Sequence, residues 1–431
     1  MSAQVTPFAF SLYIHIPFCR VKCAYCNFNT YANLDDRYSD YVRALNEEIQ
    51  AMGRYWQRPA IKTIFIGGGT PTVLNIPQLK SILSACRTAF NILPQAEITS
   101  EANPGTVSEA YLQDLLALGV NRLSFGAQSF DNTELKLLGR LHPAEEIGDT
   151  LAAARRAGAE NVNLDLIYGL PQQRLNTWRN TLQQTIALKV EHISLYSLTL
   201  EHGTALHARI ARDELPAPDA DLAADMYELA DDLLADAGYA QYEISNWSKT
   251  GRECRHNLTY WRNQPYLGVG AGAHSFMTAD RRPLTAIDSS SPLNNYPENA
   301  TRSAWGVEKI NAPRTTRYAG QRWWNVKSVS AYIEKITANG KTPHPHPSLG
   351  DWEEIDRQLE IAETIILGLR LTQEGVSLPA FEARFGQSLA EVFGPQVKKL
   401  KALKLLVEKD QRLRLTSQAR LVGNQVFMEF L

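Results

Sequence analysis

Six apolar, strand-like segments alternate with amphipathic helical segments over the first two-thirds of this 431-residue chain. The strand-like segments are rich in β-branched and aromatic residues, and they occupy residues 11–16, 61–69, 96–105, 122–130, 162–170 and 192–200. Segments with helical periodicity lie between them, for example residues 41–56, 79–90, 109–119 and 144–158. Such βα alternation predicts an α/β fold, a parallel sheet covered by helices, as either an open barrel or a doubly wound sheet.

In both architectures the binding site lies where the strands end and the following loops begin. Glu101 and Asp165 are carboxylates at two of these strand ends, able to bind an amine or ribose hydroxyls. Gln128 can hydrogen-bond there, and Arg140 can pair with a carboxylate. Taken singly, each of these residues is as well explained as a helix cap or a surface charge.

The rest of the chain has a different organisation. Residues 1–279 are expected to form the barrel, and residues 280–350 an insertion and linker rich in Ser, Pro and Asn near its start. Residues 351–431 combine three helical stretches with two short strands around a charged turn. We therefore predict a small C-terminal helical, winged-helix-like module.

Composition narrows the class of protein. With 44 Lys and Arg against 46 Asp and Glu, the formal net charge of −2 gives no global field for holding nucleic acid. No apolar run is long enough for an integral membrane segment, and no signal-peptide pattern is present, so a cytoplasmic location is expected. Five cysteines in a reducing compartment favour metal or redox chemistry over a disulfide framework.

Three of those cysteines, Cys19, Cys23 and Cys26, form the pattern C-x3-C-x2-C directly after the first strand. Thiolates are soft ligands that suit iron-sulfur clusters, and three on one loop can hold three corners of a cubane. The fourth iron is then open to a chelating ligand. Zinc is the alternative, but a structural zinc site wants four ligands, typically in separated pairs.

This loop, with Tyr25 before its last cysteine and GGGTP (residues 67–71) after the second strand, resembles the radical S-adenosylmethionine (SAM) superfamily. The resemblance implies a partial (β/α)6 TIM-like barrel, a 4Fe-4S cluster on Cys19, Cys23 and Cys26, and SAM at the open iron. The segments LYIHIPFC, RLSFGAQSF, DLIYGLPQQ and HISLYSLTLEHGT narrow it to the anaerobic coproporphyrinogen III oxidase-like family. The SAM contacts that this family implies fall on Tyr13, Tyr25, Gly68, Gly69, Thr70, Glu101, Gln128, Arg140, Asp165 and Thr199.

Two markers separate the branches of that family. The decarboxylating enzyme has a further cysteine two positions after the last cluster ligand, where this chain has Phe28. The chain also carries an H-N-x-x-Y-W motif that begins at His256. Both features resemble the heme chaperone subgroup, which implies heme as a ligand, with acceptor hemoproteins such as respiratory chain cytochromes as partners.

His256 is the candidate heme ligand, because neutral imidazole is the commonest axial ligand of heme iron. On the residues alone, a hydrogen-bonded histidine at the rim of the barrel explains it as well. No catalytic residue is assigned, and either a monomer or a homodimer is expected.

Two enzymes are the alternatives. The first is an oxygen-independent coproporphyrinogen III oxidase, which uses SAM for radical decarboxylation; Phe28 and the motif at His256 argue against it. The second is a radical SAM enzyme that acts on RNA. The balanced charge and the missing basic, aromatic-rich tract argue against that one.

Overall fold

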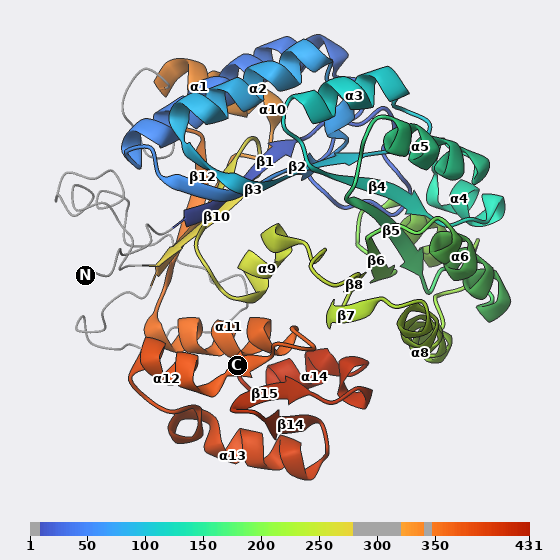
Figure 1. Ribbon diagram of the computed structural model, residues 1–431, viewed down its shortest axis with the longest axis vertical. Coiled ribbons are helices and arrows are strands. Elements are labelled where there is room, and N and C mark those ends of the chain that lie inside the picture. Colours follow the sequence, from blue (N-terminus) through green and yellow to red (C-terminus); the bar gives the residue numbers. More distant parts are fainter. Residues whose placement is uncertain (1–8, 279–319, 340–346) are drawn as a thin grey trace.

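A twelve-stranded, curved sheet forms the body of the computed structural model, which describes residues 9–278, 320–339 and 347–431 (Figure 1). Its centre is six parallel strands in chain order: β1 (Ala9–Ile16), β2 (Ala60–Gly68), β3 (Asn91–Ala102), β4 (Arg122–Gln128), β5 (Val162–Tyr168) and β6 (His192–Ser197). Figure 1 shows the intervening helices along the convex side of this sheet. They are α1 (Tyr38–Tyr55), α2 (Ile76–Ala89), α3 (Glu109–Ala117), α4 (Asn132–Leu138), α5 (Glu145–Arg156), α6 (Leu175–Ala187) and α8 (Ala220–Asp236). The predicted α/β fold with a parallel, partial barrel is confirmed.

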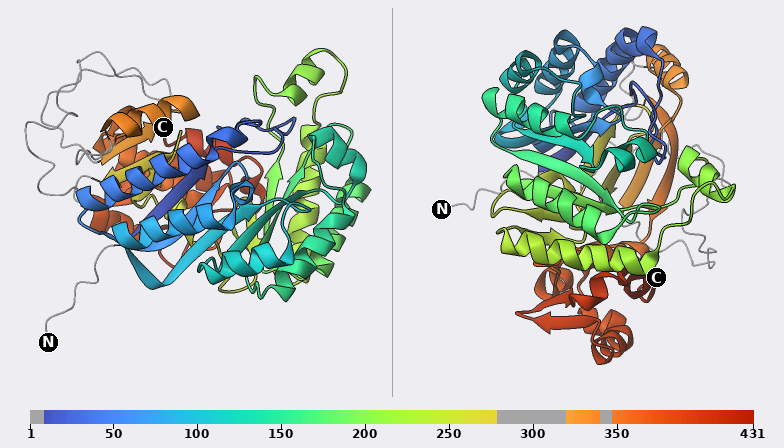
Figure 2. Two further views of the ribbon diagram at one scale, coloured as in Figure 1. Left: turned by 90° about the horizontal axis from the view of Figure 1, so that it is seen from above. Right: turned by 90° about the vertical axis from the view of Figure 1, so that its right-hand side faces the viewer.

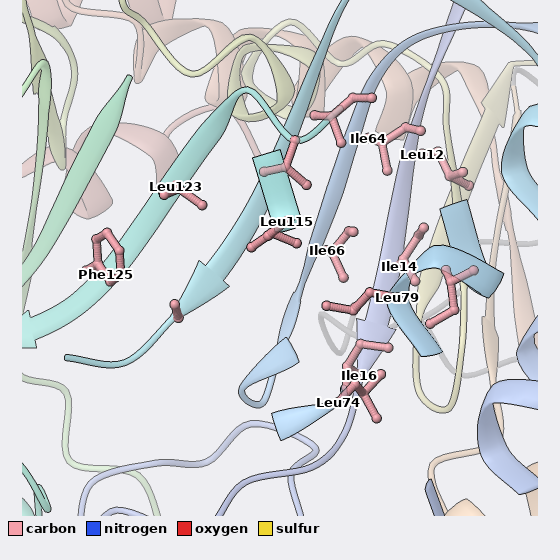
Figure 3. Packing of buried hydrophobic residues seen from close by; sticks show 14 of the residues in the cluster. Leu12, Ile14, Ile16, Ile64, Ile66, Leu74, Leu79, Leu115, Leu123 and Phe125 are labelled. Carbon is pink, nitrogen blue, oxygen red and sulfur yellow. The ribbon is translucent and has the colours of Figure 1, made fainter. Parts of the chain in front are cut away.

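Strand periodicity decides which side chains face the helices and which face the interior. Figure 3 shows Leu12, Ile14 and Ile16 of β1 beside Ile64 and Ile66 of β2 in the apolar layer under the helices. Since successive side chains of a strand point to opposite faces, the residues between them face the concave side. Those positions are largely polar or small on all six strands, and this makes the interior a binding surface rather than a second apolar core.

Both edges of the parallel sheet are extended by further strands. On the β1 side lie β9 (Tyr266–Val269), β10 (His274–Thr278), β11 (Gly320–Asn325) and β12 (Leu349–Ile355); on the β6 side lie β8 (Asn246–Ser248) and β7 (Ala240–Glu243). Strand β9 runs parallel to β1, whereas β10 runs antiparallel to β9. Because β12 and β7 form opposite edges of the described sheet, the barrel is open.

Part of the segment predicted as insertion and linker is described, namely residues 320–339 and 347–350. Here β11 and the start of β12 belong to the large sheet, and α10 (Val329–Asn339) follows β11. The division of the chain at residues 280 and 350 stays a proposal, and the Ser- and Pro-rich stretch itself lies outside the described residues.

A buried carboxylate, Glu48 of α1, ties these later strands to the barrel. It accepts hydrogen bonds from Gly270 N (2.7 Å), Asn325 Nδ2 (2.7 Å), the Tyr332 hydroxyl (2.5 Å) and Ser348 Oγ (2.6 Å). Burial raises the pKa of Glu48, and the four donors oppose that rise. One side chain thus joins α1, the loop after β9, β11, α10 and the segment before β12.

Two shorter helices flank the interior. Helix α9 (Arg255–Trp261) lies on the concave side of the sheet in Figure 1. Helix α7 (Ala205–Ala211) sits on a segment that projects from the barrel in both views of Figure 2. The amide of Leu206 in α7 donates to Ala24 O (2.8 Å), so this projection contacts the cysteine loop.

The C-terminal region has its own apolar core. Its elements are α11 (Arg357–Leu369), β13 (Val376–Ser377), α12 (Leu378–Phe385), α13 (Leu389–Ala402), β14 (Leu406–Lys409), β15 (Arg412–Leu415) and α14 (Gly423–Met428). Three strands pair in the order β13-β15-β14. The helical character is confirmed, while the comparison with a winged helix stays a prediction. The unit contacts the barrel through β7, where Thr372 Oγ1 donates to Gln241 O (2.7 Å).

Candidate functional site

The cysteine loop, residues 17–31, closes on itself at the carboxyl end of β1. Cys19 N donates to Tyr31 O (3.0 Å), and Tyr31 N donates to Pro17 O (2.8 Å). Inside the loop, Cys26 N donates to Cys23 O (3.2 Å), which forms a tight turn between these two cysteines. All three thiols are free and half-buried. The loop therefore presents the three sulfur atoms on a fixed backbone.

Two side chains from outside the cysteine loop approach its sulfur atoms. Thr70 Oγ1 lies 3.6 Å from Cys19 Sγ, and Arg140 Nη1 lies 3.4 Å from Cys23 Sγ. Burial raises the pKa of Cys19, whereas the hydrogen bond from Thr70 opposes that rise. A hydroxyl and a guanidinium directed at sulfur stabilise thiolate ligands of a cluster.

Glycines let the cysteine loop approach the end of β2. Gly68 has a φ of +106°, and a Cβ there would lie 2.3 Å from the His15 ring. A Cβ on Gly69 would lie 2.4 Å from Phe18 O. Gly69 N instead donates to Ile16 O (2.8 Å), just before the loop, and Thr70 N donates to Phe18 O (2.7 Å) within it. The glycine motif is thus required for the packing of β2 against the cysteine loop.

A cavity of about 320 Å³ opens between this loop and the strand ends. Its lining includes the three cysteines and nearly all the residues that the sequence proposes for SAM, namely Tyr25, Gly68, Gly69, Thr70, Glu101, Gln128, Arg140, Asp165 and Thr199. Tyr13 lines a neighbouring cavity instead. We call the first one the cysteine cavity. The fold brings the proposed residues together, while their individual contacts with SAM stay predictions.

The two carboxylates in the cysteine cavity differ in their partners. Asp165 accepts hydrogen bonds from Ser124 Oγ (3.0 Å) and Asn163 Nδ2 (2.9 Å), which fix its position. Glu101 accepts one, from Gly68 N (3.0 Å) to Oε2, and no described residue donates to its Oε1. Burial, with the negative charge of Asp165 adding to it, raises the pKa of Glu101 to about 8. Glu101 is therefore poised to gain a cationic ligand.

Arg140 is fixed by protein acceptors. Its Nη2 donates to Asn103 Oδ1 and to Gly126 O, both at 2.6 Å, while its Nε is buried without a partner among the described residues. The guanidinium thus lies beside Cys23, and its predicted pairing with a ligand carboxylate stays a prediction. Gln128 has a φ of 69°, a backbone conformation that residues other than glycine rarely adopt. Such conformations are enriched at binding sites.

A second cavity, of about 670 Å³, adjoins the cysteine cavity on the concave side of the sheet. The two share part of their lining, including Glu101, Asp165 and Phe28. The remainder combines polar and charged side chains with four aromatic rings, those of Tyr13, Phe65, Tyr260 and Tyr266. We call it the aromatic cavity. Its volume is within the range of sites for drug-sized ligands.

His256, the predicted heme ligand, lies beneath this aromatic cavity and is only 1% exposed. Its Nδ1 is 2.8 Å from Thr63 Oγ1 and its Nε2 is 2.8 Å from the Tyr260 hydroxyl. Burial, with Lys62 and Arg122 nearby, lowers its pKa to about 3, so the ring is neutral. Both ring nitrogens are occupied, and these contacts are those of a hydrogen-bonded histidine. The role of iron ligand stays a prediction that requires one of the two bonds to open.

The rings that follow His256 separate in space. Tyr260 lines the aromatic cavity and meets Tyr266 edge to face, with ring centroids 4.7 Å apart. Trp261 instead lies under the guanidinium of Arg370, 4.3 Å from its ring centroid, at the contact with the C-terminal unit. Only one of the two aromatic residues in the motif therefore faces a ligand cavity.

Sequence reasoning missed several lining residues. Ser124 lies on β4 opposite Glu101, and Asn163 lies on β5 two residues before Asp165. Both side chains therefore face the interior, and strand periodicity is the signal that could have identified them. Asn29 of the cysteine loop donates to Ala271 O and Lys327 O, both at 3.0 Å. No local signal in the sequence marks that contact, because its partners come from distant segments.

The three thiols suit an iron-sulfur cluster in their chemistry. Among the residues described, no three His, Cys, Asp or Glu side chains converge as they would on a single metal ion. The three thiols instead stand around a cavity. A multi-iron cluster, in which separate irons bind separate thiolates, suits this arrangement.

Known proteins with similar sequences identify the family. The model of the radical SAM superfamily matches residues 13–185, and that of the HemN C-terminal domain matches residues 355–422. The heme chaperone HemW of Bacillus subtilis is 35% identical over 424 residues, which cover 98% of this chain and 99% of the relative. The chain belongs to the HemW family. HemW of Escherichia coli is 41% identical over 305 residues, covering 70% of this chain and 80% of that relative.

Among solved structures, the coproporphyrinogen III oxidase HemN of Escherichia coli, a radical SAM enzyme, superposes with a TM-score of 0.76. It is 23% identical and covers 99% of this chain and 91% of its own, which supports the fold alone. Membership of HemW in the radical SAM superfamily implies a 4Fe-4S cluster and SAM, and the cysteine cavity fits both. No helix in the described ranges is long and apolar enough to cross a bilayer.

Proposed function

We propose that this protein is a heme chaperone that binds heme and transfers it to acceptor hemoproteins. The observation that carries the proposal is the aromatic cavity of about 670 Å³, which adjoins the cysteine cavity in a chain that aligns along its full length with proteins named heme chaperones. Flat aromatic walls suit a macrocycle.

We propose Cys19, Cys23 and Cys26 as the ligands of the 4Fe-4S cluster, with SAM bound by the residues of the cysteine cavity and by Tyr13. Glu101 is proposed to accept the SAM amine, because its Oε1 is free of described donors and a cation favours its ionised form. In the holoprotein, the methionine end of SAM would chelate the open iron of the cluster. Asp165, held by Ser124 and Asn163, is proposed to bind ribose hydroxyls.

The shared wall supplies a route by which one ligand affects the other. Glu101 and Asp165 line both cavities, so a ligand that fixes and ionises them on one side alters the surface on the other side. Phe28 stands at this boundary, 63% exposed, where the decarboxylating relatives have cysteine.

The test is an anaerobic hemin titration of the cluster-reconstituted protein, followed at the Soret band, and then transfer of the bound heme to the apo form of a b-type cytochrome. Saturable, near-stoichiometric binding followed by transfer is expected. Weak, non-saturating binding, or formation of protoporphyrinogen from coproporphyrinogen III in the same preparation, would overturn the proposal. Respiratory chain cytochromes are the acceptors that we propose, in the cytoplasm, with the protein as monomer or homodimer.

A further inference from the structure

The described histidines differ in whether their ring nitrogens are free. His15, His192 and His256 have both nitrogens within 3.0 Å of a protein oxygen. His142 has Nε2 3.3 Å from Ala127 O. His202, His207 and His274 have no hydrogen bond from either ring nitrogen to a described residue, and of these three His274 alone lines the aromatic cavity.

His274 also points into a cavity. It is the first residue of β10, and because β10 runs antiparallel to β9, this end of the strand lies at the carboxyl edge of the parallel strands. There it lines the aromatic cavity together with Tyr13 and Tyr266. Its ring stacks on that of Trp324, the residue opposite it on the neighbouring strand β11. The ring centroids are 5.4 Å apart, and the ring planes make an angle of 23°. The stacking holds the imidazole at the cavity wall while leaving its nitrogens open.

The charged residues that line the cavity are two cations, Arg122 and Lys327, and two carboxylates, Glu101 and Asp165. Lys327, just after β11, lines the cavity and forms no ion pair with a described residue. The nearby Arg322, in contrast, is bound by Glu353 and Glu363 at 2.6 and 2.9 Å. Lys327 is therefore the cation at this end that is available to a carboxylate such as a heme propionate.

We propose that heme binds in the aromatic cavity with His274 as an axial ligand of the iron and Lys327 paired with a propionate. This inference rests on the proposed function. Ligation requires a neutral imidazole that gives a nitrogen lone pair to the iron, with no other bond made or broken. Partial desolvation against the cavity wall, reinforced by the positive charges of Arg322 and Lys327 and by His15, lowers the pKa of His274, so the neutral form prevails at neutral pH.

The experiment compares hemin titrations of the wild type with those of His274→Ala, His274→Gln, His256→Ala and His202→Ala. His202 is the matched control, since it is an exposed histidine that lines neither cavity and lies 4.3 Å, ring to ring, from His207. We expect both His274 variants to bind hemin about tenfold more weakly or worse, equivalent to about 1.4 kcal/mol, with a shifted Soret band. His202→Ala is expected to behave like the wild type. SAM binding to each reconstituted variant checks that the barrel is folded.

A chemical rescue gives a readout that a structural role would not move. In His274→Gly, free imidazole is expected to restore the wild-type Soret position. Hemin binding by the His274 variants with wild-type affinity and spectrum would overturn the inference and leave the proposed function standing. An equal loss in His202→Ala would do the same, since it would show unspecific histidine binding. If the wild type itself binds no hemin, the proposed function fails.

Discussion

The two ends of the barrel interior use their polar groups differently. At the floor, formed by Thr63, Glu97, His256 and Tyr260, polar groups bond to one another; both ring nitrogens of His256 and its backbone amide are engaged. At the mouth, formed by the cysteine loop and the carboxyl ends of the strands, Glu101 Oε1 and the buried Arg140 Nε have no partner among the described residues. The floor residues therefore already have protein partners, whereas these two atoms at the mouth are open to a ligand.

The largest effect is expected from removing a thiol at the mouth. Cys23→Ala should abolish retention of the cluster, because the remaining two cysteines cannot hold three irons of a cubane. Iron and sulfide content after anaerobic reconstitution measures this. Cys86→Ala, which removes a fully buried thiol from the apolar core, is the control and should keep its full iron content. Equal iron in both variants would contradict the cluster assignment.

Removing the buried acceptor at the floor, Glu97, should destabilise the folded protein. Glu97 accepts the amides of His256 (3.0 Å) and Arg255 (3.1 Å) at the start of α9. Glu97→Ala leaves both donors unpaired, so we expect unfolding to become easier by about 3 kcal/mol. Urea denaturation followed by circular dichroism measures the change.

Glu101→Ala is the matched control at the mouth, and it should cost less because a single amide depends on that carboxylate. If the two substitutions cost the same, the distinction between floor and mouth would lose its energetic basis.

The raised pKa of Glu101 predicts a pH dependence. Between its ordinary value of 4.5 and about 8, the carboxyl stays protonated in the folded apoprotein but ionises in the unfolded chain. The unfolded state then binds fewer protons, so stability falls as pH rises through this window, by at most about 1.4 kcal/mol per pH unit. Relative to wild type, Glu101→Gln should thus gain stability across the window. A constant difference between the two proteins would show that the carboxyl titrates normally.

The smallest effect is expected at Thr63. Thr63→Val removes the partner of His256 Nδ1 and should destabilise the fold by about 1 kcal/mol. The substitution also frees Nδ1 of His256, so it tests whether this histidine can bind iron when one of its hydrogen bonds is removed. Hemin affinity and the Soret spectrum should stay as in the wild type. A new spectral species in this variant would show that His256 ligates iron once it is released.

Local patterns in the sequence predict the strands and the cysteine loop well, because both depend on neighbouring residues. The alternation of Leu12, Ile14 and Ile16 with polar residues is visible in the chain itself, as is the spacing of the cysteines. The hydrogen bonds of His256, in contrast, cannot be seen in the sequence. Its partner Thr63 is 193 positions away and meets it only when α9 packs under β2. The motif identifies the residue but does not reveal its contacts.

The same limit applies to His274. Its sequence context, GAGAHSF, carries no metal-binding spacing. Only the antiparallel direction of β10 places it at the edge where the parallel strands end. When a site is assembled from distant strands, the register of those strands must be known first. Only then can the side chains without a protein partner be identified.

The hydrogen bonds of Asn29 also set an order of events during synthesis. Asn29 belongs to the cysteine loop, and its partner Lys327 lies 298 residues later in the chain. At about 5–20 residues per second, roughly 15–60 s separate the translation of the two residues. During that interval the three thiols leave the ribosome on a loop that lacks one of its anchors. The cysteine loop therefore reaches its final set of hydrogen bonds only after residue 327 has been translated.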